Sequence, residues 1–169
     1  MKYDLRDTRT KSLLRLSKDK PLSIVLGAGG VRGMAHVGLL ESLIERDFRI
    51  AEMVGTSVGA LIISFYAAVG LSLAEMRELG LDLTSRHLLA WAWLRRAPKS
   101  IQLRFENRAG IIPTSLRRLA ETSGRRLHHG VERIGLLCYD RNTRSEVLFT
   151  NLQEHFPLED ATRGAAAIP

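Results

Sequence analysis

The chain has 169 residues, enough for one domain with a buried core, and its composition of 45% hydrophobic and 25% charged residues excludes a disordered protein. The formal net charge is +7, but the basic residues form scattered pairs rather than one block. We therefore expect a solvated basic surface with some attraction to membranes or phosphates, and no nucleic-acid partner.

The first twenty residues are charged throughout and have no apolar stretch of the kind found in a secretory signal. We expect residues 1–20 to form a mobile or helical arm and residues 21–169 to form a single domain. Cys138 is the only cysteine, so no internal disulfide can form. These features predict a cytoplasmic protein that is peripheral at a membrane if it binds one.

Two successive units of strand, turn and helix follow the arm. The apolar run 22–26 predicts a strand that leads through the loop "GAGGVRG" into a helix ending near Arg46. A second strand within 48–57 is followed by an almost wholly apolar helix over 58–69, which Gly70 ends. This order predicts an α/β fold with a mainly parallel sheet, right-handed crossovers and helices on both faces.

The apolar window 60–73 is shorter than the ~20 residues needed to span a membrane, and a buried helix explains it better. Ser72 and Glu75 have the spacing of a capping box, which predicts the start of a third helix. Residues 85–110 have no clear assignment. Beyond them we predict a helix within 111–124, a hairpin of "RIGLLCY" and "SEVLFTN", and a short helix that ends at Pro169.

The glycine loop has two interpretations. Gly27 and Gly29 fit the start of a dinucleotide fingerprint, but Arg32 occupies its sixth place and the second strand ends in "VGTSVG" without the acidic residue that holds a ribose. A P-loop is excluded because no Gly-Lys-Ser/Thr follows. A dinucleotide-binding module stays open as the alternative to an enzyme that uses the loop to bind an oxyanion.

The second strand ends in G-x-S-x-G, with Ser57 between Gly55 and Gly59. On a strand-to-helix turn this pattern is a nucleophile elbow, in which the glycines allow a sharp fold that exposes the serine Oγ. The alternative is a turn serine that caps the following helix.

The two motifs together predict acyl transfer. That chemistry needs a nucleophile and preorganised donors for the oxyanion, each donor worth ~3 kcal/mol. We assign the nucleophile to Ser57 and the oxyanion hole to amides around Gly29 and Gly30. Arg32 would add positive charge, suited to a phospholipid headgroup or to the oxyanion.

These residues resemble the patatin-like phospholipases. The G-G-G-x-R/K-G loop of that family matches residues 28–33 and its G-T-S-x-G-A elbow matches residues 55–60. The similarity continues through "MAHVGLLESL", the predicted hairpin and the terminal "ATRGAAAIP", and so covers about 21–169. It implies a lipid or other ester substrate and a serine and aspartate dyad without histidine. No cofactor is implied.

The sequence departs from the family pattern at three places. Ala28 replaces the first glycine of the loop, and Gly164 and Ala165 replace the usual Ala and Ser of the A-I-P segment. The aspartate of the family lies in an Asp-Gly motif beyond that segment, and this chain contains no Asp-Gly dipeptide. The resemblance therefore predicts a domain that is incomplete at its C-terminus, with exposed apolar surface, a nucleophile and an oxyanion loop, and impaired hydrolysis.

Two further features give weaker evidence of function. Asp140 and His155 follow Ser57 in the order of a Ser, Asp, His triad, although a turn role suits Asp140 better. Trp91 and Trp93 beside basic residues suit either an interfacial lipid-binding segment or a core. A non-catalytic, lipid-binding remnant is thus a third candidate, and no spacing typical of a metal site occurs.

Overall fold

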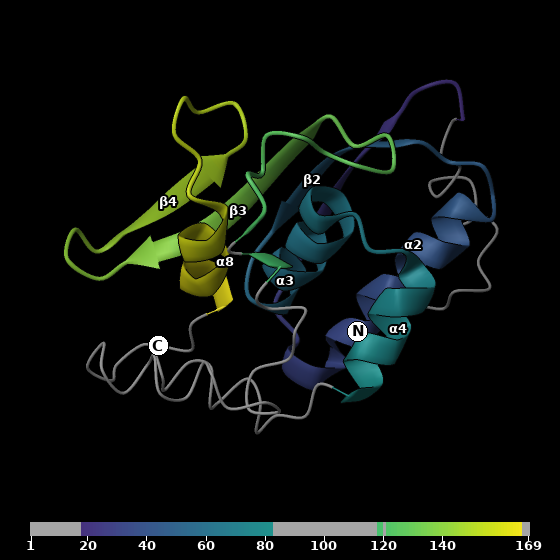
Figure 1. Cartoon of the computed structure of the whole chain (residues 1–169), viewed down its shortest axis with the longest axis horizontal. Helices are drawn as coiled ribbons and strands as arrows, with labels where there is room; N and C mark the ends of the chain where they lie inside the picture. Colours follow the sequence, from purple (N-terminus) through teal and green to yellow (C-terminus); the bar gives the residue numbers. More distant parts are fainter. Residues whose placement is uncertain (1–17, 83–117, 120, 167–169) are drawn as a thin grey trace, which may run out of the picture.

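The structure is a computed structural model that describes residues 18–82, 118–119 and 121–166. Its elements follow the predicted order (Figure 1). The strands are β1 (Leu22–Leu26), β2 (Ile50–Gly55), β3 (Arg133–Asp140) and β4 (Ser145–Thr150). The helices are η1 (Gly30–Gly33), α2 (Met34–Ile44), α3 (Val58–Ile63), η2 (Ser64–Val69), α4 (Leu73–Asp82) and α8 (Leu158–Ala166).

The four described strands form one sheet in the order β1-β2-β3-β4. β1 pairs with β2 and β2 with β3 in parallel, whereas β3 and β4 form an antiparallel hairpin. The mainly parallel α/β sheet and the hairpin are therefore confirmed. Because β1 and β2 are parallel and Leu26 pairs with Gly55, the loop after β1 and the turn after β2 leave the sheet at the same edge.

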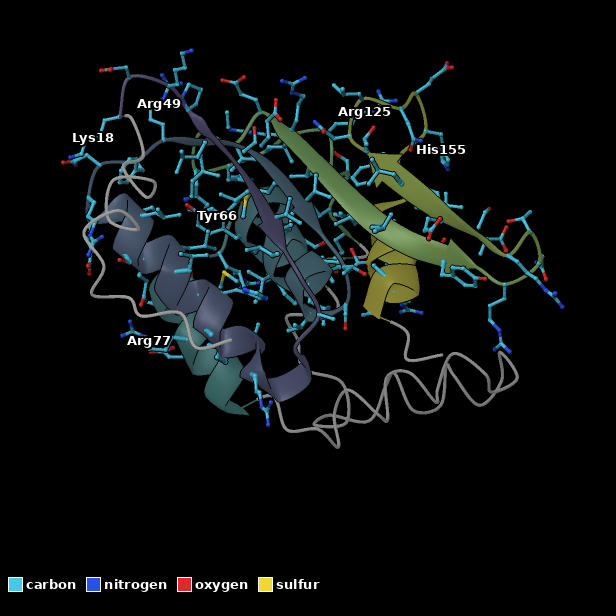
Figure 2. The ribbon with its side chains drawn as sticks, turned by 180° about the vertical axis from the view of Figure 1, so that it is seen from behind. Lys18, Arg49, Tyr66, Arg77, Arg125 and His155 are labelled. Carbon is cyan, nitrogen blue, oxygen red and sulfur yellow. The ribbon has the colours of Figure 1, made fainter. Side chains whose placement is uncertain are left out.

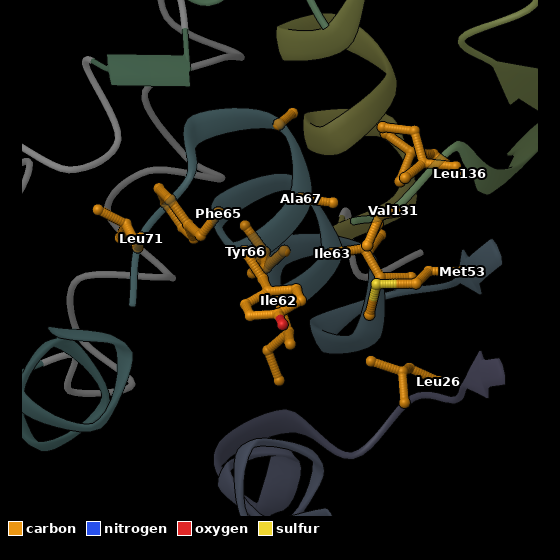
Figure 3. Packing of buried hydrophobic residues seen from close by; sticks show 14 of the residues in the cluster. Leu26, Met53, Ile62, Ile63, Phe65, Tyr66, Ala67, Leu71, Val131 and Leu136 are labelled. Atoms are coloured by element: carbon orange, nitrogen blue, oxygen red, sulfur yellow. The ribbon is translucent and has the colours of Figure 1, made fainter. Parts of the chain in front are cut away.

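The core lies on the face of the sheet that α3 and α8 cover (Figures 1 and 3). Most of α3 and η2 is buried, which confirms the buried apolar helix, although its second half widens into a π-helix from Ser64. Gly70 ends it with a left-handed φ of 82°, a conformation that glycine adopts without a Cβ clash. α2 and α4 pack against each other beside α3 and add Val37, Leu40 and Met76 to the same core.

The opposite face of the sheet carries exposed apolar side chains. Val25 is 78% exposed, Tyr139 59% and Leu148 45%. Seen from behind, the strands lie in front of α3 and α8 (Figure 2). The predicted helices on this second face stay a prediction.

The capping box is confirmed: the Ser72 backbone N–H donates to Glu75 Oε2 (2.8 Å) and the Glu75 N–H to Ser72 Oγ (3.2 Å). Of the helix predicted within 111–124, the described residues 118, 119 and 121 are helical. Residues 1–17 of the arm and the tryptophans at 91 and 93 lie outside the described residues. Among the described helices, none is long and apolar enough to cross a membrane.

Candidate active site

Ser57 occupies the turn between β2 and α3 in an unusual backbone conformation, with φ of 53° and ψ of −127°. A non-glycine residue in such a region costs ~1–3 kcal/mol and persists only where its surroundings hold it. The Ser57 side chain makes no capping hydrogen bond to α3. The geometry is therefore that of a strained elbow and does not support the interpretation of Ser57 as a capping serine.

The two glycines of the elbow allow backbone segments to approach more closely than any side chain would permit. A Cβ at Gly59 would lie 2.1 Å from the Leu26 carbonyl oxygen, at the end of β1. A Cβ at Gly55 would lie 2.7 Å from the backbone carbon of Gly59. Both positions therefore require glycine because of close backbone contacts, and the turn could not close around larger residues.

The glycine loop lies directly beside this elbow. The Thr56 N–H donates to the Leu26 carbonyl (3.1 Å), which ties the elbow to the end of β1. A Cβ at Gly33 would lie 2.3 Å from Cγ2 of Val58, the residue after Ser57. The structure thus brings together the two motifs that the sequence separates by some twenty residues.

Within the loop, Gly30 adopts a left-handed φ of 52° and begins the short helix η1. The Arg32 N–H donates to the Gly29 carbonyl (3.0 Å), and residue 32 is exposed. In the described part of the chain, the N–H groups of Gly29 and Gly30 have no backbone acceptor. The amide of Arg32 is thus engaged within the loop.

Two contacts of this region have no signal in the sequence. His36 Nε2 lies 3.1 Å from the Gly27 carbonyl oxygen, so the half-buried imidazole on α2 closes the glycine loop. The Ser57 N–H donates to the Ala165 carbonyl (2.9 Å) in the last turn of α8. The amide of the elbow serine is therefore engaged by the protein itself.

The structure separates the members of the alternative triad. Both carboxylate oxygens of Asp140 accept hydrogen bonds within the hairpin turn, from the Asn142 N–H (2.8 Å) and the Thr143 hydroxyl (2.9 Å), and these bonds lower its pKa. His155 is exposed on the loop after β4 (Figure 2). Because β4 runs antiparallel to β3, this loop lies at the end of the sheet away from Ser57. Neither residue is placed to take a proton from the Ser57 Oγ.

No group of three or more His, Cys, Asp or Glu side chains among the described residues is arranged to hold a metal ion. The described site consists of the Ser57 hydroxyl, the backbone amides of the glycine loop and the exposed Arg32. This donor set suits the attack of an oxygen nucleophile on a carbonyl whose oxygen becomes negative.

Comparison with known proteins assigns the family. The profile of the patatin-like phospholipases matches residues 24–169, which include both glycine motifs, and the chain belongs to this family. The resemblance read from the sequence is thereby confirmed.

Individual relatives match shorter stretches. The lysophospholipase NTE1 of Candida glabrata is 40% identical over 55 residues, which are 32% of this chain and 3% of the relative. An uncharacterized NTE family protein of Mycobacterium bovis is 36% identical over 76 residues, 45% of this chain and 21% of the relative. A patatin-like phospholipase domain-containing protein of Caenorhabditis elegans is 44% identical over 55 residues. The aligned regions thus span 21% or less of these three relatives.

Proposed function

We propose that this chain carries the nucleophile and the oxyanion loop of a lipid acyl hydrolase. The observation that carries the proposal is the strained backbone of Ser57 between two glycines that admit no Cβ, directly beside the glycine loop. Strain of this kind marks functional sites, because an unstrained serine turn would fold more favourably. Family membership and the lysophospholipase relative support a lipid ester as the substrate.

In the proposed reaction, the Ser57 Oγ forms a bond to the ester carbonyl carbon and its proton passes to a base. The carbonyl electrons move to the oxygen, which the amides of Gly29 and Gly30 hold, with the exposed Arg32 adding positive charge nearby. Collapse of this intermediate breaks the ester C–O bond, and the alcohol leaves with a proton. Water then hydrolyses the acyl-enzyme and releases the fatty acid.

We assign no base within the part of the chain that the structure describes. The chain contains no Asp-Gly dipeptide, and Asp140 and His155 are placed elsewhere. Loss of one member of a catalytic serine unit lowers kcat by about 10⁴- to 10⁶-fold. We therefore expect the chain on its own to hydrolyse p-nitrophenyl butyrate feebly, and a fluorophosphonate to label Ser57 slowly.

The test compares the unchanged chain with Ser57→Ala and with Ser145→Ala, which removes an exposed serine of the hairpin. Labelling located by peptide mass spectrometry should disappear in Ser57→Ala and persist in Ser145→Ala. Absence of labelled Ser57 in the unchanged chain would contradict the nucleophile. Rapid turnover that requires Ser57 would contradict the missing base and indicate an internal one.

The alternatives predict different results with the same protein. Stabilisation by NAD or NADP in a thermal melt would support the dinucleotide-binding module. Sedimentation with phospholipid vesicles, without any labelling of Ser57, would support a lipid-binding remnant.

A further inference from the structure

The last turn of α8 touches the proposed nucleophile through the backbone. The Ala165 carbonyl accepts the hydrogen bond from the Ser57 N–H, at 2.9 Å. On the other side of Ser57, its carbonyl accepts the Ala60 N–H (3.0 Å) at the start of α3. Ser57, with its strained φ of 53°, is therefore held by one hydrogen bond to its own helix and by one to α8, far along the chain. Only the bond to Ala165 can be changed without altering the elbow itself.

A pair of buried hydroxyls ties α8 to the helix that follows Ser57. Ser64 Oγ and Thr162 Oγ1 lie 2.8 Å apart, and both residues are 0% exposed. Each hydroxyl also lies within hydrogen-bonding distance of a carbonyl one turn back in its own helix, that of Ala60 for Ser64 (2.8 Å) and that of Leu158 for Thr162 (2.6 Å). Only two hydroxyl hydrogens serve these three short contacts, so when one hydroxyl donates to the other, only the accepting hydroxyl also donates to a carbonyl.

The sheet holds the opposite side of α8. Cys138 Sγ on β3 lies 3.3 Å from the Ala161 carbonyl oxygen, and a Cβ at Gly164 would lie 3.3 Å from the same sulfur. α8 therefore contacts β3 on one side and α3 on another, and it lies beside α3 over the sheet (Figure 1). The hydroxyl pair and the Cys138 contact are polar contacts of α8 among the described residues, and such directional contacts favour one position of a helix more strongly than apolar contacts do.

We propose that Thr162 is a positioning residue: its hydrogen bond to Ser64 fixes α8 so that the Ala165 carbonyl holds the Ser57 amide and keeps the serine in its strained conformation. The inference rests on the proposed role of Ser57 as nucleophile. Thr162 acts through α8 and does not touch the substrate.

The test uses the full chain and two substitutions at one position. Thr162→Val removes the hydroxyl and keeps the shape, whereas Thr162→Ser keeps the hydroxyl. Amide hydrogen exchange by NMR gives the exchange rate of Ser57 divided by that of Ile63, deep in α3, and this ratio corrects for overall stability. We expect the ratio to rise at least tenfold in Thr162→Val and to stay within twofold in Thr162→Ser. Val37→Ala, which weakens the core in α2, should also leave it within twofold.

The rate of Ser57 labelling by a fluorophosphonate is the functional readout, expected to fall at least tenfold in Thr162→Val and to be retained in Thr162→Ser. Ser64→Ala removes the other hydroxyl and replaces Thr162→Val if that variant does not fold. An unchanged exchange ratio, an equal rise in all variants, or a raised ratio with unchanged labelling would overturn the inference. If the unchanged chain is not labelled, the nucleophile is refuted, and the exchange ratio still decides whether Thr162 holds the Ser57 amide.

Discussion

Side-chain size is limited by neighbouring backbone at several positions around Ser57. The Leu26 carbonyl oxygen lies 2.1 Å from where a Cβ of Gly59 would be, and the side chain of Val58 would clash with a Cβ of Gly33. At Ser57 itself a side chain is present in a backbone conformation that favours glycine. Glycine is present at positions 33 and 59, where close approach requires it. Position 57, whose φ favours glycine, has a serine instead, as expected where function outweighs stability.

Replacing Ser57 by glycine should therefore stabilise the fold. Relief of ~1–3 kcal/mol of backbone strain outweighs the ~0.5–1 kcal/mol lost to the flexibility of unfolded glycine, so we expect a gain of about 1 kcal/mol in the free energy of unfolding. Urea denaturation measures it. Ser145→Gly, at an exposed residue of β4, is the control and should lose stability. A loss of equal size in both variants would mean that Ser57 is not strained.

Gly59→Ala should have the opposite effect. Its Cβ would meet the Leu26 carbonyl oxygen at 2.1 Å, and displacement of β1 or α3 should cost about 3 kcal/mol or more. Gly38→Ala is the matched control because a Cβ there meets nothing within 4 Å on α2, and alanine in a helix is favoured by ~0.5–1 kcal/mol. Thermal melts of the two variants should shift in opposite directions, and similar shifts would contradict the close approach.

At the scale of single elements, local hydrogen bonds mark the start of α4 and the turn of the hairpin. Ser72 and Glu75 exchange hydrogen bonds at the start of α4, and the exposed Glu75 side chain also accepts from the Ser72 hydroxyl (2.8 Å). In the hairpin turn, the Asp140 carboxylate accepts hydrogen bonds from the Asn142 N–H and the Thr143 hydroxyl. Such elements depend on pH, since their acceptors are carboxylates.

Glu75→Gln should show this dependence. The Ser72 N–H, and then the Ser72 hydroxyl, lower the pKa of Glu75, so its carboxylate stabilises the fold at neutral pH, and that stabilisation is lost as the pH falls through the lowered value. We expect Glu75→Gln to melt below the unchanged chain at neutral pH and the two melting temperatures to converge as the pH falls through the lowered pKa of Glu75. Glu78→Gln, on the same helix but outside the capping box, should give a smaller and flatter difference. A constant gap across this range would contradict the charged cap.

At the scale of the whole molecule, the two faces of the sheet differ. One packs on α3 and α8, while the other presents Val25, Tyr139 and Leu148 to solvent. Val25 and Leu148 lie in one continuous patch. Val25 pairs with Val54, and a Cβ at Gly135 would have both Val54 and Leu148 within 3.3 Å. Parallel sheets commonly bury both faces, so an exposed apolar patch of this kind favours binding or self-association.

Substitution of Val25 and Leu148 should reduce the binding of apolar molecules to this face without destabilising the fold. We expect Val25→Thr combined with Leu148→Thr to lower the fluorescence of bound anilinonaphthalene sulfonate by about half or more, because threonine suits strands and is polar. The melting temperature should change little, since both side chains are already exposed. Leu152→Thr removes another exposed leucine outside the sheet and should have a minor effect. Equal effects of the two replacements would mean that the sheet face is not the binding surface.

Much of the fold and part of the candidate site could be predicted from the sequence, because the signals are local. The strand over 22–26, the capping box at Ser72 and the hairpin depend on residues a few places apart, and the structure confirms them. The glycine spacing around Ser57 likewise indicated a sharp turn, and the family match confirmed the resemblance that joined the two motifs.

Only the tertiary structure decided which distant groups meet. The hydrogen bond from Ser57 to Ala165, the hydroxyl pair of Ser64 and Thr162, and the contact of His36 with Gly27 each join different elements. Such contacts leave no periodic pattern in a single sequence, since they depend on how the elements pack after they form. The sequence by itself thus determined the family, the turns and the order of the elements. Packing decided the conformation of Ser57, the separation of Asp140 from His155, and the helix that holds the elbow.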